Sequence, residues 1–109
     1  MIEELKEIAI KANNLGFKSR TVTTIHTEKY LLGGKNTMLN EMCFYLYLCD
    51  IQEWLREKHN MLVYLLWYDD NITEARWSIY VDKIYINGNV DYKKGLEIGI
   101  KKALTLIKI

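Results

Sequence analysis

EMCFYLYLCDIQEWLREKHN (Glu41 to Asn60) runs without a break into MLVYLLWY (Met61 to Tyr68), and the hydrophobic period changes between them. In the first segment the apolar residues recur at three- and four-residue spacing, which predicts a helix. They include Phe44, Leu48, Ile51 and Leu55. Asn40 is a good N-cap for this helix, although a start near Thr37 is also open. The second segment is apolar at both parities, which is typical of a strand covered on both faces, or covered on one and aromatic on the other.

Outside this region, composition limits the class of protein. The chain has 109 residues, no proline, eight tyrosines and a net charge of +1. This length predicts one domain, and the near-neutral charge provides no overall field that attracts nucleic acid or an anionic membrane. The longest apolar runs have eight residues, well short of the roughly 20 that span a bilayer. With an N-terminus interrupted by acids and lysines, the chain is expected to be a cytoplasmic protein.

The first part of the chain divides into a helix and a connection. Apolar residues at helical spacing predict an amphipathic helix within residues 1–16, which Gly16 ends. Residues 17–38 are predicted to be an irregular connection to an α-β-β-β-α core at 39–109. Within it the β-branched cluster Thr21 to Ile25 suggests a short strand, while a helical turn capped by Thr27 is the alternative.

The end of the core shows two more strands and a helix. Residues 74–81 alternate cleanly, and the parity switches at Asp82-Lys83, which predicts a two-residue turn or a bulge. Asp91 is placed to cap a helix that runs to about Ile107. Gly95 and Gly99 on one side of it predict a close approach to the sheet or another helix, and Glu97 falls on its polar side. The expected fold is α+β, with an antiparallel meander of three strands and the helices packed on one face.

No constellation for catalysis is present. A nucleophilic triad needs an activated Ser, Cys or Thr near a base. The only histidines, however, are His26 in the ambiguous segment and His59 at a helix end, where the helix dipole favours it. The acidic stretch Asp69 to Glu74 lacks the pattern of a calcium-binding loop, and Gly33-Gly34 lacks that of a phosphate loop. The two cysteines, Cys43 and Cys49, are six apart on the predicted helix, so they point about 240° apart at about 100° per residue. We therefore expect no disulfide, metal or cofactor, and a protein that is not an enzyme.

A binding surface is nevertheless predicted on the sheet face away from the helices. There, tyrosines interleave with basic residues. The candidate residues are Tyr64, Tyr68, Arg76, Tyr80, Lys83 and Tyr85, with Lys93 and Lys94 of the last helix. The first hypothesis is a non-enzymatic accessory or protein-interaction module, which associates with another protein or with itself as a homodimer through this face or through an edge at Ile98 and Ile109. The alternative is a nucleic-acid-binding module that stacks bases on the tyrosines.

Two segments carry resemblances. LCDIQEWLREKHN (Leu48 to Asn60) and YKKGLEIGIKKALTLI (Tyr92 to Ile107) resemble small uncharacterised phage and mobile-element proteins of gut Bacteroidales, a likeness that implies no activity. The order helix, three strands, helix, with a lysine-rich last helix, is more loosely similar to the double-stranded RNA-binding domain. In place of that family's loop with proline and histidine, this chain has Asp69-Asp70-Asn71.

Overall fold

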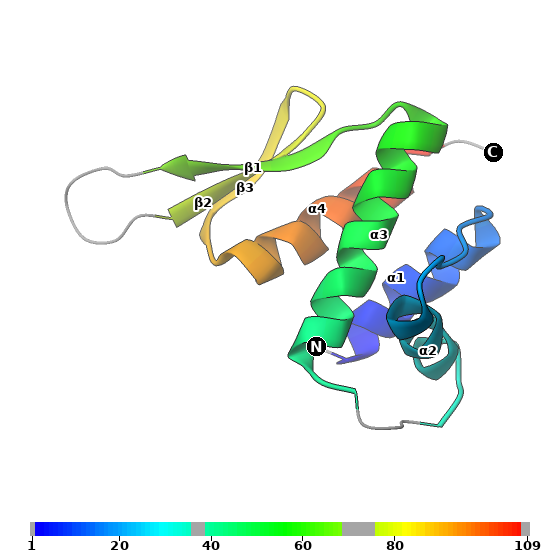
Figure 1. The fold of residues 1–109 in the computed structure, drawn as a ribbon. Helices are drawn as coiled ribbons and strands as arrows, with labels where there is room; N and C mark the ends of the chain where they lie inside the picture. The colour runs from blue at the N-terminus through cyan, green and yellow to red at the C-terminus, as the bar shows by residue number, and fades with distance from the viewer. Residues whose placement is uncertain (1, 36–38, 69–75, 108–109) are drawn as a thin grey trace.

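The computed structural model describes residues 2–35, 39–68 and 76–107, and of Tyr68, Arg76 and Asn89 it describes the backbone alone. Four helices and three strands lie within these ranges (Figure 1). In chain order they are α1 (Ile2–Asn14), α2 (Val22–Leu31), α3 (Glu41–His59), β1 (Val63–Tyr68), β2 (Arg76–Val81), β3 (Ile84–Val90) and α4 (Tyr92–Leu106). The α+β prediction is confirmed. None of the described helices is both long enough and apolar enough to cross a membrane.

The strands form an antiparallel sheet in the order β1-β2-β3. Val81 pairs with Ile84, which confirms the two-residue turn at Asp82-Lys83. Asp82 takes φ 55°, and its main-chain N–H donates to Leu62 O over 2.7 Å while its carboxylate accepts from Leu62 N over 2.9 Å. These bonds hold an aspartate where asparagine or glycine is usual. Register shifts on both sides of Ile79 show that the pairing of β2 with β3 also has irregularities of the bulge type.

Helix α4 lies directly on the sheet, as its glycines predicted. Asp91 caps it by accepting from Lys94 N over 2.8 Å. A Cβ on Gly99 would lie 2.7 Å from Cγ1 of Val63 and 2.9 Å from Cγ2 of Ile79. Real Cβ atoms essentially never approach this closely, so glycine is what allows the helix to reach the sheet at this point.

Helix α3 packs beside α4 and also contacts β1 of the sheet. Asn40 caps it by accepting from Cys43 N over 3.1 Å, and Asn60 ends it in the left-handed conformation at φ 50°. The helix contacts α4, and the amide of Gln52 donates to Val63 O of β1 over 2.7 Å. Helices α1 and α2 pack on the other helices, so all four gather on the side of the sheet that α4 covers (Figure 1).

The connection before α3 is not irregular. Residues 22–31 form α2, with Thr21 as the N-cap and Thr24 completing a capping box. The short strand expected at Thr21 to Ile25 and the cap expected at Thr27 are therefore wrong. Thr24 and Thr27 are buried, and the Thr27 hydroxyl donates to Thr23 O over 2.9 Å, which satisfies it inside the helix. Threonines at core positions gave this helix a β-like composition.

The core lies between the helices and continues under the sheet. Phe17 meets the rings of Tyr47 and Trp54 edge on, with centroids 5.8 and 5.5 Å apart. Ile51 and Ile100 are fully buried and link this helical core to α4. Burying aromatic side chains of this size contributes a large share of the hydrophobic stabilisation.

Candidate functional site

The sheet face away from α4 carries a row of three tyrosines, one from each strand. Tyr64 pairs with Tyr80, and Tyr80 pairs with Tyr85. The rings of Tyr64 and Tyr80 are parallel within 8° with centroids 5.3 Å apart, and Tyr85 meets Tyr80 edge on at 5.7 Å. The middle ring therefore has a ring neighbour on each flank, and cross-strand aromatic pairs of this kind stabilise the sheet themselves.

The surroundings of this row are mostly apolar or uncharged. Leu66, on the same face of β1, is 51% exposed. A Cβ on Gly88 would lie 2.5 Å from the Tyr85 hydroxyl oxygen, so glycine leaves room for the tyrosine to lie along β3. Lys83 is exposed in the turn at the end of the row. Together these residues form what we call the tyrosine face: Tyr64, Leu66, Tyr80, Lys83 and Tyr85.

The predicted lysines of α4 are not brought to this face. Lys93 and Lys94 lie in the first turn of α4, where Lys93 Nζ is 3.8 Å from a Glu41 oxygen and Lys94 Nζ is 2.8 Å from a Glu4 oxygen. The side chains of Tyr68 and Arg76 lie outside the described part of the chain, as does Ile109. Ile98 is half-buried in α4. The tyrosines are thus gathered as predicted, but the lysines of α4 lie elsewhere.

Strand β1 is an outer strand of the sheet, so alternate residues direct their main-chain N–H and C=O groups toward β2 and away from it. Leu62 bonds to Asp82, which continues the pairing with β2, and ladder bonds in an antiparallel pair recur at every second residue. The main-chain groups of Val63, Leu65 and Trp67 are therefore directed away from β2. The bond from Gln52 to Val63 O agrees with this direction. Leu65 and Trp67 present their N–H and C=O groups at the outer edge.

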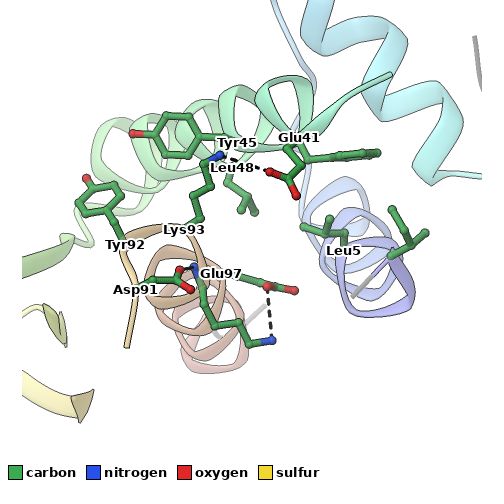
Figure 2. Close-up of a pocket in the computed structure, with 11 residues that line it drawn as sticks. Leu5, Glu41, Tyr45, Leu48, Asp91, Tyr92, Lys93 and Glu97 are labelled. Atoms are coloured by element: carbon green, nitrogen blue, oxygen red, sulfur yellow. Dashed lines mark hydrogen bonds and ion pairs between the residues drawn. The ribbon is translucent and has the colours of Figure 1, made fainter. Parts of the chain in front are cut away.

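A pocket of about 590 Å³ lies elsewhere, where the N-terminal parts of α1, α3 and α4 meet (Figure 2). Apolar and aromatic side chains form much of its lining: Ile2, Leu5, Phe44, Tyr45, Leu48 and Tyr92. The charged lining residues are Glu41, Asp91, Lys93, Lys94 and Glu97. Hydrogen bonding to Cys49, together with burial, raises the pKa of Tyr45 to about 12, so its hydroxyl is neutral at physiological pH.

Glu97 is the unusual member of this lining. The sequence placed it on the polar side of its helix, which is wrong, because the residue is only 8% exposed. Its Oε2 is 3.6 Å from Lys94 Nζ, whereas its buried Oε1 has no hydrogen-bond partner among the described residues. Burial raises the pKa of this carboxyl; the neighbouring Glu4 acts in the same direction, and the Lys94 ammonium opposes both.

Sequence reasoning missed this pocket. The capping residues Asn40 and Asp91 each marked a helix start, but nothing in a linear pattern shows that two helix starts meet. The one available signal was Glu97 itself, a carboxylate that lies in the helix between Leu96 and Ile100, both of which are buried.

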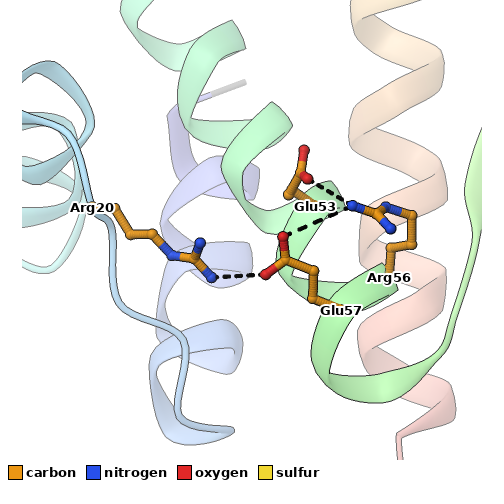
Figure 3. A network of polar contacts seen from close by, with 4 residues as sticks. All are labelled: Arg20, Glu53, Arg56 and Glu57. Atoms are coloured by element: carbon orange, nitrogen blue, oxygen red, sulfur yellow. Dashed lines mark hydrogen bonds and ion pairs between the residues drawn. The ribbon is translucent and has the colours of Figure 1, made fainter.

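The other charged residues that the structure describes give no catalytic arrangement. Glu53 and Glu57, the pair of carboxylates on α3, both contact Arg56 at 2.7 and 3.8 Å, and Glu57 also binds Arg20 at 3.0 Å (Figure 3). The hydrogen bond from Arg20 lowers the pKa of Glu57, which keeps it ionised rather than ready to donate a proton. Within the described ranges no three His, Cys, Asp or Glu side chains gather closely enough to hold a metal ion.

Histidine and cysteine chemistry find no support in the geometry either. His26 is exposed, and the ring of His59 lies 4.6 Å from that of Trp54. Both cysteines are free thiols and half-buried.

Comparisons of the chain with protein-family models, with curated proteins and with solved structures find no match.

Proposed function

We propose that the protein is a small non-enzymatic interaction module that binds a second copy of itself through the outer edge of β1 and the adjoining tyrosine face. The observation that carries this proposal is the outer edge at Leu65 and Trp67, where no other described strand pairs with β1. An outer strand with unpaired main-chain groups is a template for another strand. Soluble proteins usually protect such an edge with lysine, proline or a covering element.

The chemistry of β1 favours its own copy as the partner. Val63–Tyr68 contains no charged residue and no proline, so an antiparallel pairing of two copies brings no like charges together. Leu65 and Trp67 of both copies together offer about four inter-strand hydrogen bonds. Leu66 and Trp67 are 51% and 56% exposed, and their burial supplies the apolar part of the interface.

The ring geometry favours a protein partner over nucleic acid. A base-stacking platform offers free aromatic faces and nearby cations, whereas Tyr80 is flanked by Tyr64 and Tyr85. Among the described side chains, Lys83 in the turn beside the row is the predicted cation nearest to it in sequence, because Lys93 and Lys94 contact acids elsewhere.

Light scattering coupled to size-exclusion chromatography tests the proposal. The wild-type chain, 12.9 kDa as a monomer, is expected to approach twice that mass as its concentration rises from low to high micromolar. The variant Leu66→Lys should stay monomeric, because it places an ammonium group from each copy beside the paired β1 strands. Val22→Lys is the matched control, since Val22 is 73% exposed on α2, far from β1 in sequence.

Two results would overturn the proposal. A wild-type chain that remains monomeric over the whole concentration range has no self-association to explain. A dimer that survives in Leu66→Lys as well as in Val22→Lys assembles through a different surface. Circular dichroism of both variants shows that the fold is intact in each comparison.

A further inference from the structure

The pocket between the starts of α1, α3 and α4 has the form of a small-molecule site. Its volume of about 590 Å³ falls in the range of ligand pockets, which are mainly apolar with a few polar groups that fix orientation. Leu5, Phe44, Tyr45 and Tyr92 supply apolar and aromatic lining from three different helices. Tyr45 and Tyr92 meet edge on with centroids 6.2 Å apart, so their rings lie side by side.

The polar group of this pocket is the Glu97 carboxyl. Figure 2 shows its side chain leaving α4 and pointing toward Leu5 of α1. The side chain is 10% exposed, and Oε1 is buried without a hydrogen-bond partner in the described structure. An unsatisfied buried carboxylate oxygen is unfavourable, and buried polar groups nearly always have a partner. A ligand in the pocket would supply a donor to this carboxyl at the part of the side chain that is exposed.

The charges around Glu97 select the kind of donor. Glu4 reaches it from α1, Lys94 from its own helix, and Glu41 with Lys93 lie at the α3 side of the pocket. The ammonium of Lys94 is shared between Glu4 and Glu97, and that of Lys93 lies 3.8 Å from Glu41. Four acids, Glu4, Glu41, Asp91 and Glu97, thus face two lysines, so acidic side chains outnumber basic ones around the pocket.

We propose that this pocket binds a primary amine with an apolar or aromatic body, whose ammonium group donates to the Glu97 carboxyl while the body lies against Leu5, Phe44, Tyr45 and Tyr92. The ammonium supplies a charge-assisted donor to this carboxyl and offsets part of the excess of acidic side chains. A carboxylate ligand would meet Glu97 and Glu41 instead, and a neutral alcohol would donate without balancing the charge. The inference is independent of self-association, because it uses none of the residues of β1.

Three probes of one shape test the proposal: 2-phenylethylamine, 2-phenylethanol and phenylacetate. Titrations followed by two-dimensional amide NMR give an affinity for each, and the residues whose signals move locate the site. The amine is expected to bind at least about tenfold more tightly than the alcohol, since a hydrogen bond to a charged group is stronger than a neutral one. Its shifts should centre on Leu5, Tyr45 and Tyr92.

Two variants separate the role of Glu97 from a general charge effect. Glu97→Gln keeps the size of the side chain and removes its charge, so the preference for the amine over the alcohol should disappear while alcohol binding is retained. Glu7→Gln is the control, because Glu7 is an exposed glutamate of α1 whose nearest cation is Lys101 at 3.5 Å, outside the pocket lining. It should keep the wild-type preference.

The following outcomes would overturn the proposal. One is that phenylacetate or the alcohol binds as tightly as the amine, which would make the pocket an anion or a purely apolar site. Another is that amine-induced shifts lie outside the pocket, or that millimolar amine causes none. These measurements need only the wild-type chain, so the proposal stays falsifiable if Glu97→Gln does not fold.

Discussion

Replacing Gly99 by alanine sets two effects of opposite sign against each other. Inside a helix alanine is favoured over glycine by about 0.5 to 1 kcal/mol. The added methyl group, however, would lie 2.7 Å from Val63 Cγ1 and 2.9 Å from Ile79 Cγ2. Both neighbours are buried and β-branched, so neither can turn aside easily. Overpacking of a well-filled core costs about 1 to 3 kcal/mol, and two simultaneous contacts place this site in the upper part of that range.

The packing term therefore exceeds the helix term. We expect Gly99→Ala to lower the free energy of unfolding by about 1 to 2 kcal/mol, the difference between the two effects. For a domain of this size that corresponds to a fall in Tm of roughly 4 to 10 °C. Urea titration and thermal unfolding, both followed by circular dichroism, measure the two quantities. Lys102→Ala, at an exposed position of the same helix, is the control and should change little.

A double-mutant cycle with Val63→Ala tests the physical cause. Removing the methyl groups of Val63 makes room for the new Cβ, so the double variant should be less destabilised than the sum of the two single variants, by about 1 kcal/mol. Strict additivity would show that the two residues do not compete for space. A Gly99→Ala protein more stable than the wild type would refute the reasoning altogether, because helix propensity would then outweigh the contact.

Three further predictions concern the turn, the buried carboxyl and the tyrosine face. Asp82→Ala should lower the free energy of unfolding by about 1 to 2 kcal/mol, since alanine is strained at φ 55° and the Leu62 N–H loses its acceptor. Asp82→Asn should change the free energy of unfolding by less than about 0.5 kcal/mol. Equal effects of the two variants in urea titrations would contradict this prediction. Because the pKa of Glu97 is raised in the folded state above its usual 4.5, the folded protein holds this proton more tightly than the unfolded chain. The wild type should therefore lose stability relative to Glu97→Gln as the pH rises above 4.5. Urea titrations of both proteins near pH 4 and near pH 7 measure this. A difference in free energy of unfolding between the two proteins that is the same at both pH values would count against the prediction. Titration with labelled single- and double-stranded oligonucleotides at two salt concentrations should show no salt-sensitive binding at micromolar protein; binding that weakens with salt would instead support the nucleic-acid alternative.

The elements that carry strong local signals were predictable from the sequence. Asn40 and Asp91 are side chains that favour the first position of a helix, and both act there as caps. Gly99 inside an otherwise regular helical pattern indicated a close contact, which the structure confirms. The parity change at Asp82-Lys83 indicated a two-residue turn or a bulge, because a one-residue slip would move every apolar side chain of β3 to the other face, and the structure has the turn.

The features that were missed depend on contacts between distant segments. The full length of helix α2 was not predicted, because Thr24 and Thr27 fill core positions where a leucine would usually be found. Their hydroxyls bond within the helix, a compensation that no hydrophobic pattern reveals. Glu97 was misplaced for a related reason, since a charged side chain is assigned to water by default and its burial depends on how α1 crosses α4. The parallel stacking of Tyr64 on Tyr80 likewise follows from strand pairing and side-chain torsions rather than from spacing.

The contact between Trp77 and Tyr92, edge on with centroids 4.9 Å apart, has an optical consequence. Tyr92 lines the pocket, whereas Trp77 belongs to the sheet, so an indole in β2 directly touches the wall of a cavity built from helices. We expect the tryptophan emission of the chain, to which Trp77 contributes together with Trp54 and Trp67, to change when a molecule enters the cavity and moves the phenol ring. The chain therefore carries its own fluorophore beside the chamber, and a ligand library can be screened against it without any label.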